Sequence, residues 1–264
     1  MAELFIELFS EEIPPKLQID ARQEIKRKIE EKLLKKEISF KASKSFSTPK
    51  RLVFLLDGIP EKIEQKKKII KGPKIDSPEV ALEGFIKSNN LNKRDVYKKK
   101  IEKGEFYFAE IKPKVINILK EFESIIPEVL QSYSWKKSMK WANYDLSWAR
   151  PLKSIIALFN NEVIDFKFFH LQSNNLTSVD DTDENKQKKV SNFKSYLKIL
   201  RSQNIVLDQE KRKAIILKRM LSICSSKNLK NSFDEKLIEE VVNLIEKPNV
   251  LLGEFNEIYL KIPQ

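Results

Sequence analysis

Two almost unbroken apolar runs on either side of an amphipathic pattern constrain the fold of this chain most strongly. Residues 4–9 and 52–56 are rich in Leu, Phe, Ile and Val, and short runs of this kind bounded by turn residues are typical of strands. Between them, apolar side chains recur at every fourth position from Leu17 to Leu33. This spacing predicts an amphipathic helix from Pro15 to about Lys36.

The mixture of strand and helix patterns continues to about residue 170. Strands are predicted around Phe46 and residues 69–70, and hairpins over 96–111 and 152–169. The second hairpin would turn at Asn160-Asn161, a pair that tolerates positive φ. Helices are predicted over 114–131 and from the Asp76 N-cap to Asn89, the latter burying Ala81, Leu82 and Phe85.

The composition changes after residue 172. Residues 173–190 have few apolar side chains and include an acidic run at 180–184, which is typical of a polar linker or a loop. Helical spacing returns at 191–203, 208–226 and 234–246, with Asp208 and Asp234 as expected N-caps. We therefore predict an α+β fold: a mixed strand/helix domain at 1–172, the polar segment at 173–190, and a mostly helical, truncated module at 191–264.

Composition excludes several classes of protein. The 264 residues contain one Cys and one His, too few for a disulfide framework or an ordinary zinc site. No apolar run reaches the roughly 18–20 residues of a membrane-spanning helix, and the acidic N-terminus does not resemble a signal peptide, so we expect a soluble, cytoplasmic chain. The net charge of +12 attracts polyanions, although an AT-rich genome would also favour Lys over Arg.

Sequence motifs for catalysis are missing. The sequence has no glycine-rich phosphate loop, no nucleophile elbow and a single histidine. Cys224 in an apolar helical stretch is interpreted as a buried small hydrophobe, and His170 at a strand end as structural. Glu11 and Glu12 precede a helix, where carboxylates complement the helix dipole. We expect no catalytic residue and no metal site in this chain.

One segment combines aromatic and cationic side chains densely. Residues 133–153 contain all three tryptophans, two tyrosines and five cations, with Asp145 as the single acid. Rings can stack on unpaired bases while cations hold phosphates, as in proteins that bind single-stranded or looped RNA. The alternative is that the tryptophans pack in the core and the lysines are solvated. The basic stretches 62–74 and 93–103 fit a solvated face as well as a phosphate track.

A series of short segments along the chain is informative when taken in order. They are ELFSEEIPPK at 7–16, STPKRL at 47–52, KGP at 71–73, ALEGF at 81–85, KGEFYF at 103–108, KSMKW at 137–141, WARPLKSIIAL at 148–158 and NLIEKPNVLLGEF at 243–255. In this order they resemble the beta subunit of bacterial heterotetrameric glycyl-tRNA synthetase. The chain departs from the family at 178–181, where Ser-Val-Asp-Asp replaces a T-x-G-H-R-F segment. Family members also continue for several hundred residues, which implies an N-terminal fragment.

This resemblance implies a class II aminoacyl-tRNA synthetase, a ligase of protein biosynthesis that works as a heterotetramer of two alpha and two beta subunits. ATP and Mg would be used by the alpha subunit, while the beta subunit supplies most of the tRNA binding. The matched motifs carry no catalytic residue. We therefore expect a non-catalytic portion that binds tRNA and the alpha subunit. The candidate tRNA contacts are Lys50, Arg51, Lys136, Lys137, Lys140, Trp141 and Arg150.

Two other functions remain open at this stage. The chain could be a docking scaffold for the alpha subunit with little RNA contact, in which case its charge reflects genomic bias. It could also be an editing module that deacylates mischarged tRNA, although the shortage of His and Cys argues against this.

Overall fold

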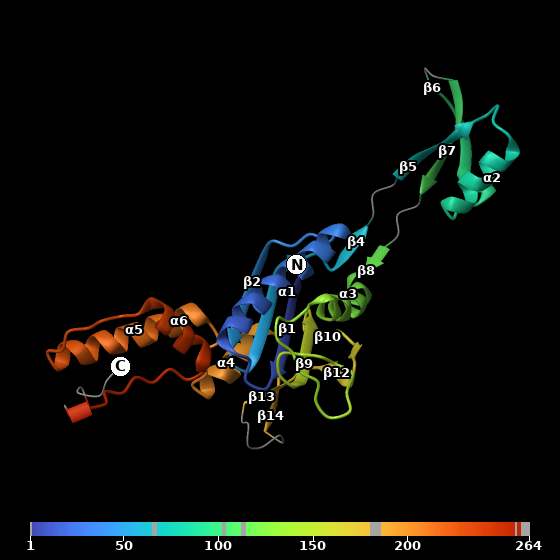
Figure 1. Cartoon of the computed structure of the whole chain (residues 1–264). Coiled ribbons are helices and arrows are strands. Elements are labelled where there is room, and N and C mark those ends of the chain that lie inside the picture. Colours follow the sequence, from blue (N-terminus) through green and yellow to red (C-terminus); the bar gives the residue numbers. More distant parts are fainter. Residues whose placement is uncertain are drawn as a thin grey trace. The chain divides into compact units, whose positions relative to one another are not determined.

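The computed structural model describes residues 2–64, 68–101, 104–111, 115–179, 186–256 and 258–259. Contacts between the residues group the chain into two units, one formed by 1–60 with 119–264 and the other by 61–118. Both helices and sheets are present (Figure 1), which confirms the predicted α+β class. The further division into a mixed domain, a polar segment and a helical module stays a prediction.

The first unit contains a seven-stranded sheet and five helices among its described residues. Its strands are β1 (Ala2–Ser10), β2 (Ala42–Thr48), β3 (Arg51–Ile59), β9 (Leu152–Phe159), β10 (Glu162–Val163), β11 (Lys167–Phe168) and β12 (Leu171–Asn174), with β13 (Leu176–Ser178) and β14 (Gln187–Lys189) as a separate pair. Its helices are α1 (Pro15–Lys35), α3 (Ile118–Ser132), α4 (Phe193–Ser202), α5 (Gln209–Ser226) and α6 (Glu235–Leu244).

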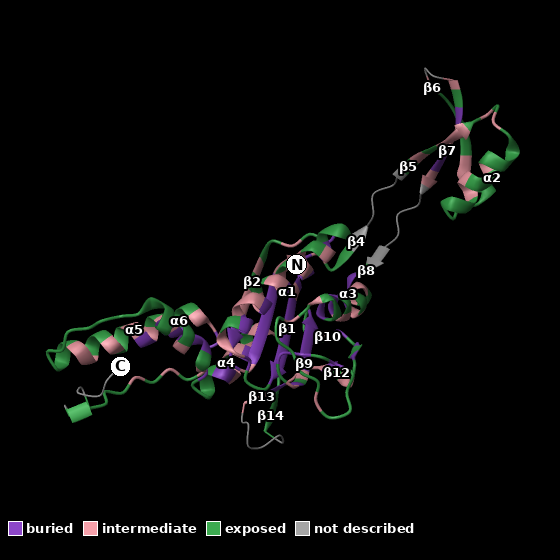
Figure 2. Ribbon diagram, in the orientation of Figure 1, coloured by how far each residue is buried: buried purple, intermediate pink, exposed green. Residues whose placement is uncertain are grey.

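The sheet of the first unit is covered on both faces. Its strands run in the order β11-β12-β9-β1-β3-β2, and the apolar run predicted at 4–9 lies in β1 at the centre. One face packs on α1 and α3, where the ring of Phe122 lies 5.0 Å from that of Phe159. Burial on both faces explains why β1 and β3 are apolar at nearly every position (Figure 2) rather than alternating.

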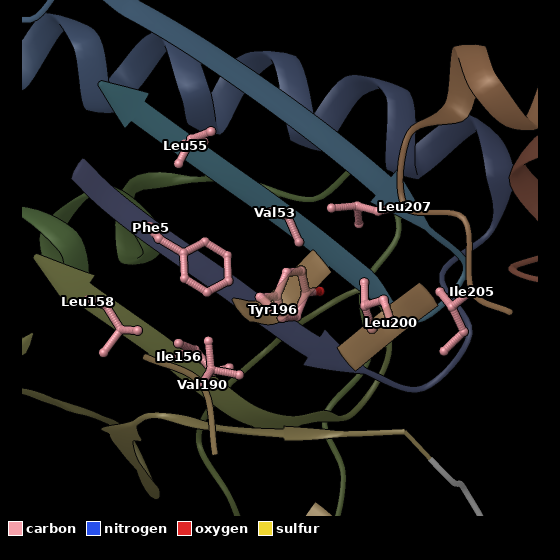
Figure 3. Close-up of a cluster of buried hydrophobic side chains, with 10 residues drawn as sticks. All are labelled: Phe5, Val53, Leu55, Ile156, Leu158, Val190, Tyr196, Leu200, Ile205 and Leu207. Atoms are coloured by element: carbon pink, nitrogen blue, oxygen red, sulfur yellow. The ribbon is translucent and has the colours of Figure 1, made fainter. Parts of the chain in front are cut away.

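The opposite face of the same sheet packs on α4. Phe5, Val53 and Ile156 from three neighbouring strands meet Tyr196 and Leu200 of α4 in one buried cluster (Figure 3). The ring centroids of Phe5 and Tyr196 are 4.9 Å apart. Side chains separated by almost 200 residues therefore share one core, which fixes α4 against the centre of the sheet.

Helices α5 and α6 are joined to the sheet by a buried arginine. The guanidinium of Arg212 donates to the carbonyls of Val206, Leu207, Val242 and Ser47 at 2.7–2.9 Å. Burial lowers its pKa to about 10, so Arg212 stays charged at neutral pH. Four carbonyl acceptors compensate for the burial of this charge, since a buried charge without partners is costly.

The second unit is smaller. Its described elements are β4 (Lys62–Glu64), β5 (Lys68–Lys74), α2 (Glu79–Ser88), the 3-10 helix η1 (Lys93–Asp95), β6 (Val96–Ile101), β7 (Gly104–Ile111) and β8 (Val115–Asn117). Strands β5, β7 and β6 form an antiparallel sheet in that order, and β4 pairs with β8. The hairpin predicted over 96–111 is confirmed, while its turn at 102–103 lies outside the described residues.

Several local predictions are confirmed. Asn160 and Asn161 have φ of 50° and 69° between β9 and β10. The side chains of Asp208 and Asp234 accept hydrogen bonds from backbone N–H groups at the starts of α5 and α6. These features depend only on neighbouring residues.

Other local predictions are wrong. Helix α2 begins at Glu79 after an N-cap at Pro78, not Asp76, and none of its residues is buried. Residues 115–117 form strand β8, so α3 starts at Ile118, later than predicted. Cys224 is half-buried rather than enclosed. Thr177, inside the stretch predicted as a polar linker or loop, is buried in strand β13.

Candidate nucleic-acid interface

The aromatic and cationic segment forms a loop between α3 and β9 that is anchored by Trp148. A β-bridge joins Met139 to Trp148, with N–H···O distances of 2.8 and 3.1 Å in the two directions. Trp148 is only 1% exposed, and its ring contacts that of Trp135 with 5.0 Å between centroids. For Trp148 the core-packing alternative is therefore correct, and the buried ring fixes the base of the loop.

Trp141 lies at the outer part of the same loop in a second aromatic group. It is half-buried, and its ring contacts Tyr144 and His170 at centroid distances of 6.4 and 5.9 Å. Tyr144 is stacked on His170, with centroids 3.6 Å apart and rings only 7° from parallel. The accessible ring of Tyr144 thus has a backing ring behind it, which is a suitable support for a stacked base.

The cations of the loop are at the surface. Lys136, Lys137, Lys140 and Arg150 are all exposed. Lys136 pairs with Asp20 at 2.6 Å and Lys140 approaches Asp145 at 3.8 Å. Exposed pairs of this kind contribute about 0–1 kcal/mol, so a phosphate can replace the carboxylate at little cost.

Lys50 lies near the C-terminal end of the loop, because both are hydrogen-bonded to the end of β1 and the residue that follows it. The N–H of Ser10 donates to the carbonyl of Lys50, and the N–H of Glu11 donates to that of Pro151, both at 2.9 Å. The ammonium of Lys50 is 3.7 Å from the carboxylate of Glu12, and Lys153 binds Glu11 at 2.5 Å. The acidic pair that sequence reasoning assigned to the helix dipole therefore neutralises two lysines.

Arg51 requires a correction, because it is interior and cannot meet a surface phosphate. Its side chain is 2% exposed, its Nε donates to Glu7 Oε1 at 3.0 Å, and it also binds Glu246 and the carbonyl of Ser178. The guanidinium lies 4.8 Å from the centroid of the Phe9 ring. Arg51 therefore joins β1 and β3 to the segment after α6 instead of contacting RNA.

Glu7 is at the centre of this buried network. Its Oε1 also accepts from Tyr196 Oη at 2.7 Å and from Thr177 Oγ1 at 3.1 Å. Burial raises the pKa of the Glu7 carboxyl above its ordinary value, and the nearby Arg51 charge opposes that rise. Burial likewise raises the pKa of the Tyr196 hydroxyl, which stays protonated and donates to Glu7.

The network opens at one end onto a cavity of about 310 Å³. Lys50, Arg51, Glu12, Glu246 and Lys247 contribute to its lining. Its lining combines three cations with two carboxylates, and these carboxylates pair with Lys50 and Arg51, so little positive charge is left to attract a polyanion. The cationic loop at 136–150 is the better match for phosphate.

Sequence reasoning missed Tyr196 and Glu246, and it included Tyr144 in the aromatic and cationic segment without selecting it as a candidate contact. Glu7 gave a usable signal, since a carboxylate inside an apolar strand must find a partner once it is buried. Nothing in the sequence identifies which of 50 cations that partner is. Tyr144 and His170 are separated by 25 residues, and only the fold shows that they stack.

The fold and this surface define a basic α+β protein with an exposed aromatic and cationic loop. The sequence matches the family described as glycyl-tRNA synthetase beta subunit over residues 4–264, so the chain belongs to that family. It is 37% identical over 264 residues to the glycine--tRNA ligase beta subunit of Rickettsia typhi, covering 100% of this chain and 40% of the relative. The proteins of the same name from Rickettsia akari and Rickettsia peacockii are 37% and 36% identical, with the same coverage. The chain thus spans about 40% of the length of these relatives.

Two kinds of feature are absent from the described residues. None of their helices combines the length and apolar character needed to cross a membrane. Within the same residues, no group of three or more His, Cys, Asp or Glu side chains is arranged to hold a metal ion.

Proposed function

We propose that this chain supports the ATP-dependent attachment of glycine to its tRNA by binding the tRNA and an alpha subunit. Membership of the beta-subunit family and the relatives' name as ligase subunits support this role. The chemistry would be carried out by the partner subunit, with its ATP and Mg, in the cytoplasm. This chain would contribute RNA contacts and a docking surface.

The exposed loop cations are the observation that supports tRNA binding. Lys136, Lys137, Lys140 and Arg150 project from a loop whose base is fixed by a buried tryptophan. Because the foot of the loop is already fixed, the loop loses less conformational entropy when it binds phosphates. Lys50, near the end of this loop, would add a contact by exchanging Glu12 for a phosphate. The rings of Trp141 and Tyr144 would stack with a nucleobase.

Neutralising two lysines tests the proposal. In Lys137→Gln/Lys140→Gln, we expect weaker binding of glycine tRNA and a smaller dependence of affinity on salt. Each lost phosphate contact should reduce the salt slope by about 0.7–0.9, so the pair should reduce it by about 1.4–1.8. Binding is measured by fluorescence anisotropy from low to moderate salt, together with glycylation in the presence of the alpha subunit.

The matched control is Lys194→Gln/Lys198→Gln on α4, which removes the same charge from exposed positions of another element. Equal effects of the two double variants would show non-specific attraction and overturn the assignment of the loop. In glycylation, loss of tRNA contacts should raise KM for tRNA and leave kcat nearly unchanged.

Exposed apolar side chains favour a protein-docking role beside RNA binding. Leu251 and Phe255, after α6, are 83% and 70% exposed, and Leu237 and Leu244 of α6 are exposed as well. Large exposed apolar side chains concentrated in one stretch of the chain favour a contact with another protein. We expect Leu251→Ser/Phe255→Ser to weaken co-purification with the alpha subunit, whereas Leu34→Ser on α1, another exposed leucine, should not. Unchanged co-purification would place the docking surface elsewhere.

A further inference from the structure

The three-stranded sheet of the second unit gathers aromatic and cationic side chains on one face. Directly paired residues of antiparallel strands project to the same side, and alternate residues share a face. Tyr97 pairs with Phe108 and Lys99 pairs with Phe106, while Lys71 of β5 pairs with Phe108 from the other edge. This face, here called the aromatic strip, comprises Lys71, Lys74, Tyr97, Lys99, Phe106 and Phe108.

Helix α2 packs against the opposite face. A methyl group added at Gly72 would lie 2.9 Å from the ring of Phe85, so α2 and β5 are in close contact there. Ala109, which alternates with Phe108, is completely buried. Helix α2 lies beside β5 (Figure 1), and the register therefore assigns the aromatic strip to the side of the sheet opposite α2.

Lysine ammonium groups lie over the rings of the strip. The Nζ of Lys71 is 3.5 Å from the centroid of the Phe106 ring, and Lys74 is 5.8 Å from the same centroid. Lys99 lies 5.9 Å from the Phe108 ring. The ring of Tyr97, stacked against Phe108 at 6.2 Å, is itself 39% exposed. Cations and rings thus alternate on this face, with each ammonium group within 6 Å of a ring centroid.

The second unit carries more net positive charge than its share of the chain length would give. Residues 61–118 contain 15 Lys and Arg against 9 Asp and Glu, which is half of the chain's net charge of +12 in 58 residues. Within the described part of the chain, Lys71, Lys74 and Lys99 form no ion pair with a carboxylate, and Glu110 lies toward one end of the strip. The strip therefore presents unneutralised positive charge beside accessible aromatic rings.

We infer that the aromatic strip binds an unpaired segment of RNA, with bases stacked on Tyr97 and Phe108 and phosphates held by Lys71, Lys74 and Lys99. Aromatic rings on an open sheet accept bases of any sequence, and neighbouring cations follow the backbone. The inference rests on the proposed function only in the choice of RNA. It adds a second contact, on a different unit from the cationic loop.

The chemistry of the strip favours an unpaired strand over the two other polyanions that it could meet. Stacked bases of a duplex expose edges and phosphates but no ring faces, so a duplex would leave Tyr97 without a partner. An acidic protein would pair with the lysines but would not use the stacked rings. An unpaired strand satisfies both features at once.

The experiment compares the two faces of the β5-β7-β6 sheet, using the whole chain. Fluorescence anisotropy measures binding of a labelled ten-nucleotide RNA and of the same sequence as a duplex. Tyr97→Leu keeps an apolar side chain but removes the ring, and we expect about a tenfold loss of single-strand affinity. Lys71→Gln/Lys99→Gln should reduce the salt slope by about 1.4.

The matched control is Lys98→Gln/Lys100→Gln, which removes equal charge from β6 on the opposite face. The inference is overturned if both double variants act equally, if Tyr97→Leu binds like the unaltered chain, or if the duplex binds as well as the single strand. Competition by polyglutamate as effective as that by polyuridylate would indicate an acidic protein instead. If the strip does not bind RNA, Lys137→Gln/Lys140→Gln should still weaken tRNA binding. If the proposed function is wrong, that loop variant should bind tRNA as the unaltered chain does.

Discussion

The two main sheets of this chain differ in how many of their faces are covered. The sheet of the first unit lies between α1 and α3 on one side and α4 on the other, and β1 and β3 are buried almost throughout. The sheet of the second unit is covered by α2 on one side, and on its other side the ring of Tyr97 is exposed and that of Phe108 is half-buried. A covered sheet provides stability, whereas an open one provides a surface for contact.

Charged residues follow the same division. Within the covered sheet, Arg51 and Glu7 are paired and surrounded by further hydrogen bonds. On the open sheet, Lys71 and Lys99 lie over rings and remain accessible to a ligand. Positive charge in one sheet therefore serves the fold and in the other is available for binding, although both sheets belong to one basic chain.

Truncation of a core ring should show the largest difference between the sheets. Phe54 of β3 is completely buried, so Phe54→Ala should lower the free energy of unfolding by about 3–5 kcal/mol. Phe108→Ala on the open sheet should cost about 1–2 kcal/mol, because that ring is only half-buried. All three tryptophans lie in the first unit, so their fluorescence in urea reports Phe54→Ala and should barely respond to Phe108→Ala. An equal response would contradict the division.

Removing a charge tests the same comparison with a different kind of residue. Arg51→Gln leaves the buried Glu7 and the half-buried Glu246 without their cation and should lower the free energy of unfolding by about 3 kcal/mol. Lys99→Gln should change it by less than about 0.5 kcal/mol, as substitutions at exposed sites usually do. Urea unfolding followed by circular dichroism covers both units. A stable Arg51→Gln would show that the buried network contributes specificity rather than stability.

Gly72→Ala tests the covered side of the smaller sheet. The added methyl group would lie 2.9 Å from the ring of Phe85 and force α2 to shift, at a cost of about 1–3 kcal/mol. Hydrogen exchange should therefore become faster in peptides from 68–101, while tryptophan-monitored unfolding of the first unit stays unchanged. Unaltered exchange in β5 and α2 would show that the two elements do not pack as described.

Sequence patterns predicted the structural features that depend on residues close together in the chain. The apolar runs of β1 and β3, the four-residue spacing of α1 and the aspartate caps of α5 and α6 each follow from a few consecutive residues. The fate of Arg51 does not, because its partners Glu7 and Glu246 are 44 and 195 residues away. An arginine next to Lys50 in a turn looks like a surface residue until the fold encloses it.

The candidate sites show the same limit. Trp141 and Trp148 occur in one aromatic and basic segment, yet a β-bridge buries the second and leaves the first accessible. The stretches 62–74 and 93–103 could not be told from solvated faces in the sequence. Strand register adds what the sequence lacks, since it aligns Lys71, Tyr97 and Lys99 along the two sides of β7.

The pH dependence of stability should show the smallest difference between the buried charges of the covered sheet and the exposed charges of the open sheet. Burial raises the pKa of the Glu7 carboxyl above 4.5, its ordinary value and that expected in the unfolded chain. Between pH 4.5 and the raised value, the native state binds more protons than the unfolded state, so the free energy of unfolding falls as pH rises. One carboxyl can contribute a slope of at most about 1.4 kcal/mol per pH unit.

Glu7→Gln removes this titration and leaves every other ionisable group in place. The free energy of unfolding of the unaltered chain, minus that of Glu7→Gln, should therefore decline from pH 4.5 upward and level off above the native pKa of Glu7. Urea unfolding at half-unit pH steps gives the two curves. A difference that instead rises with pH would mean that Arg51, Tyr196 and Thr177 more than compensate for burial, and the covered sheet would then gain stability from its internal charge.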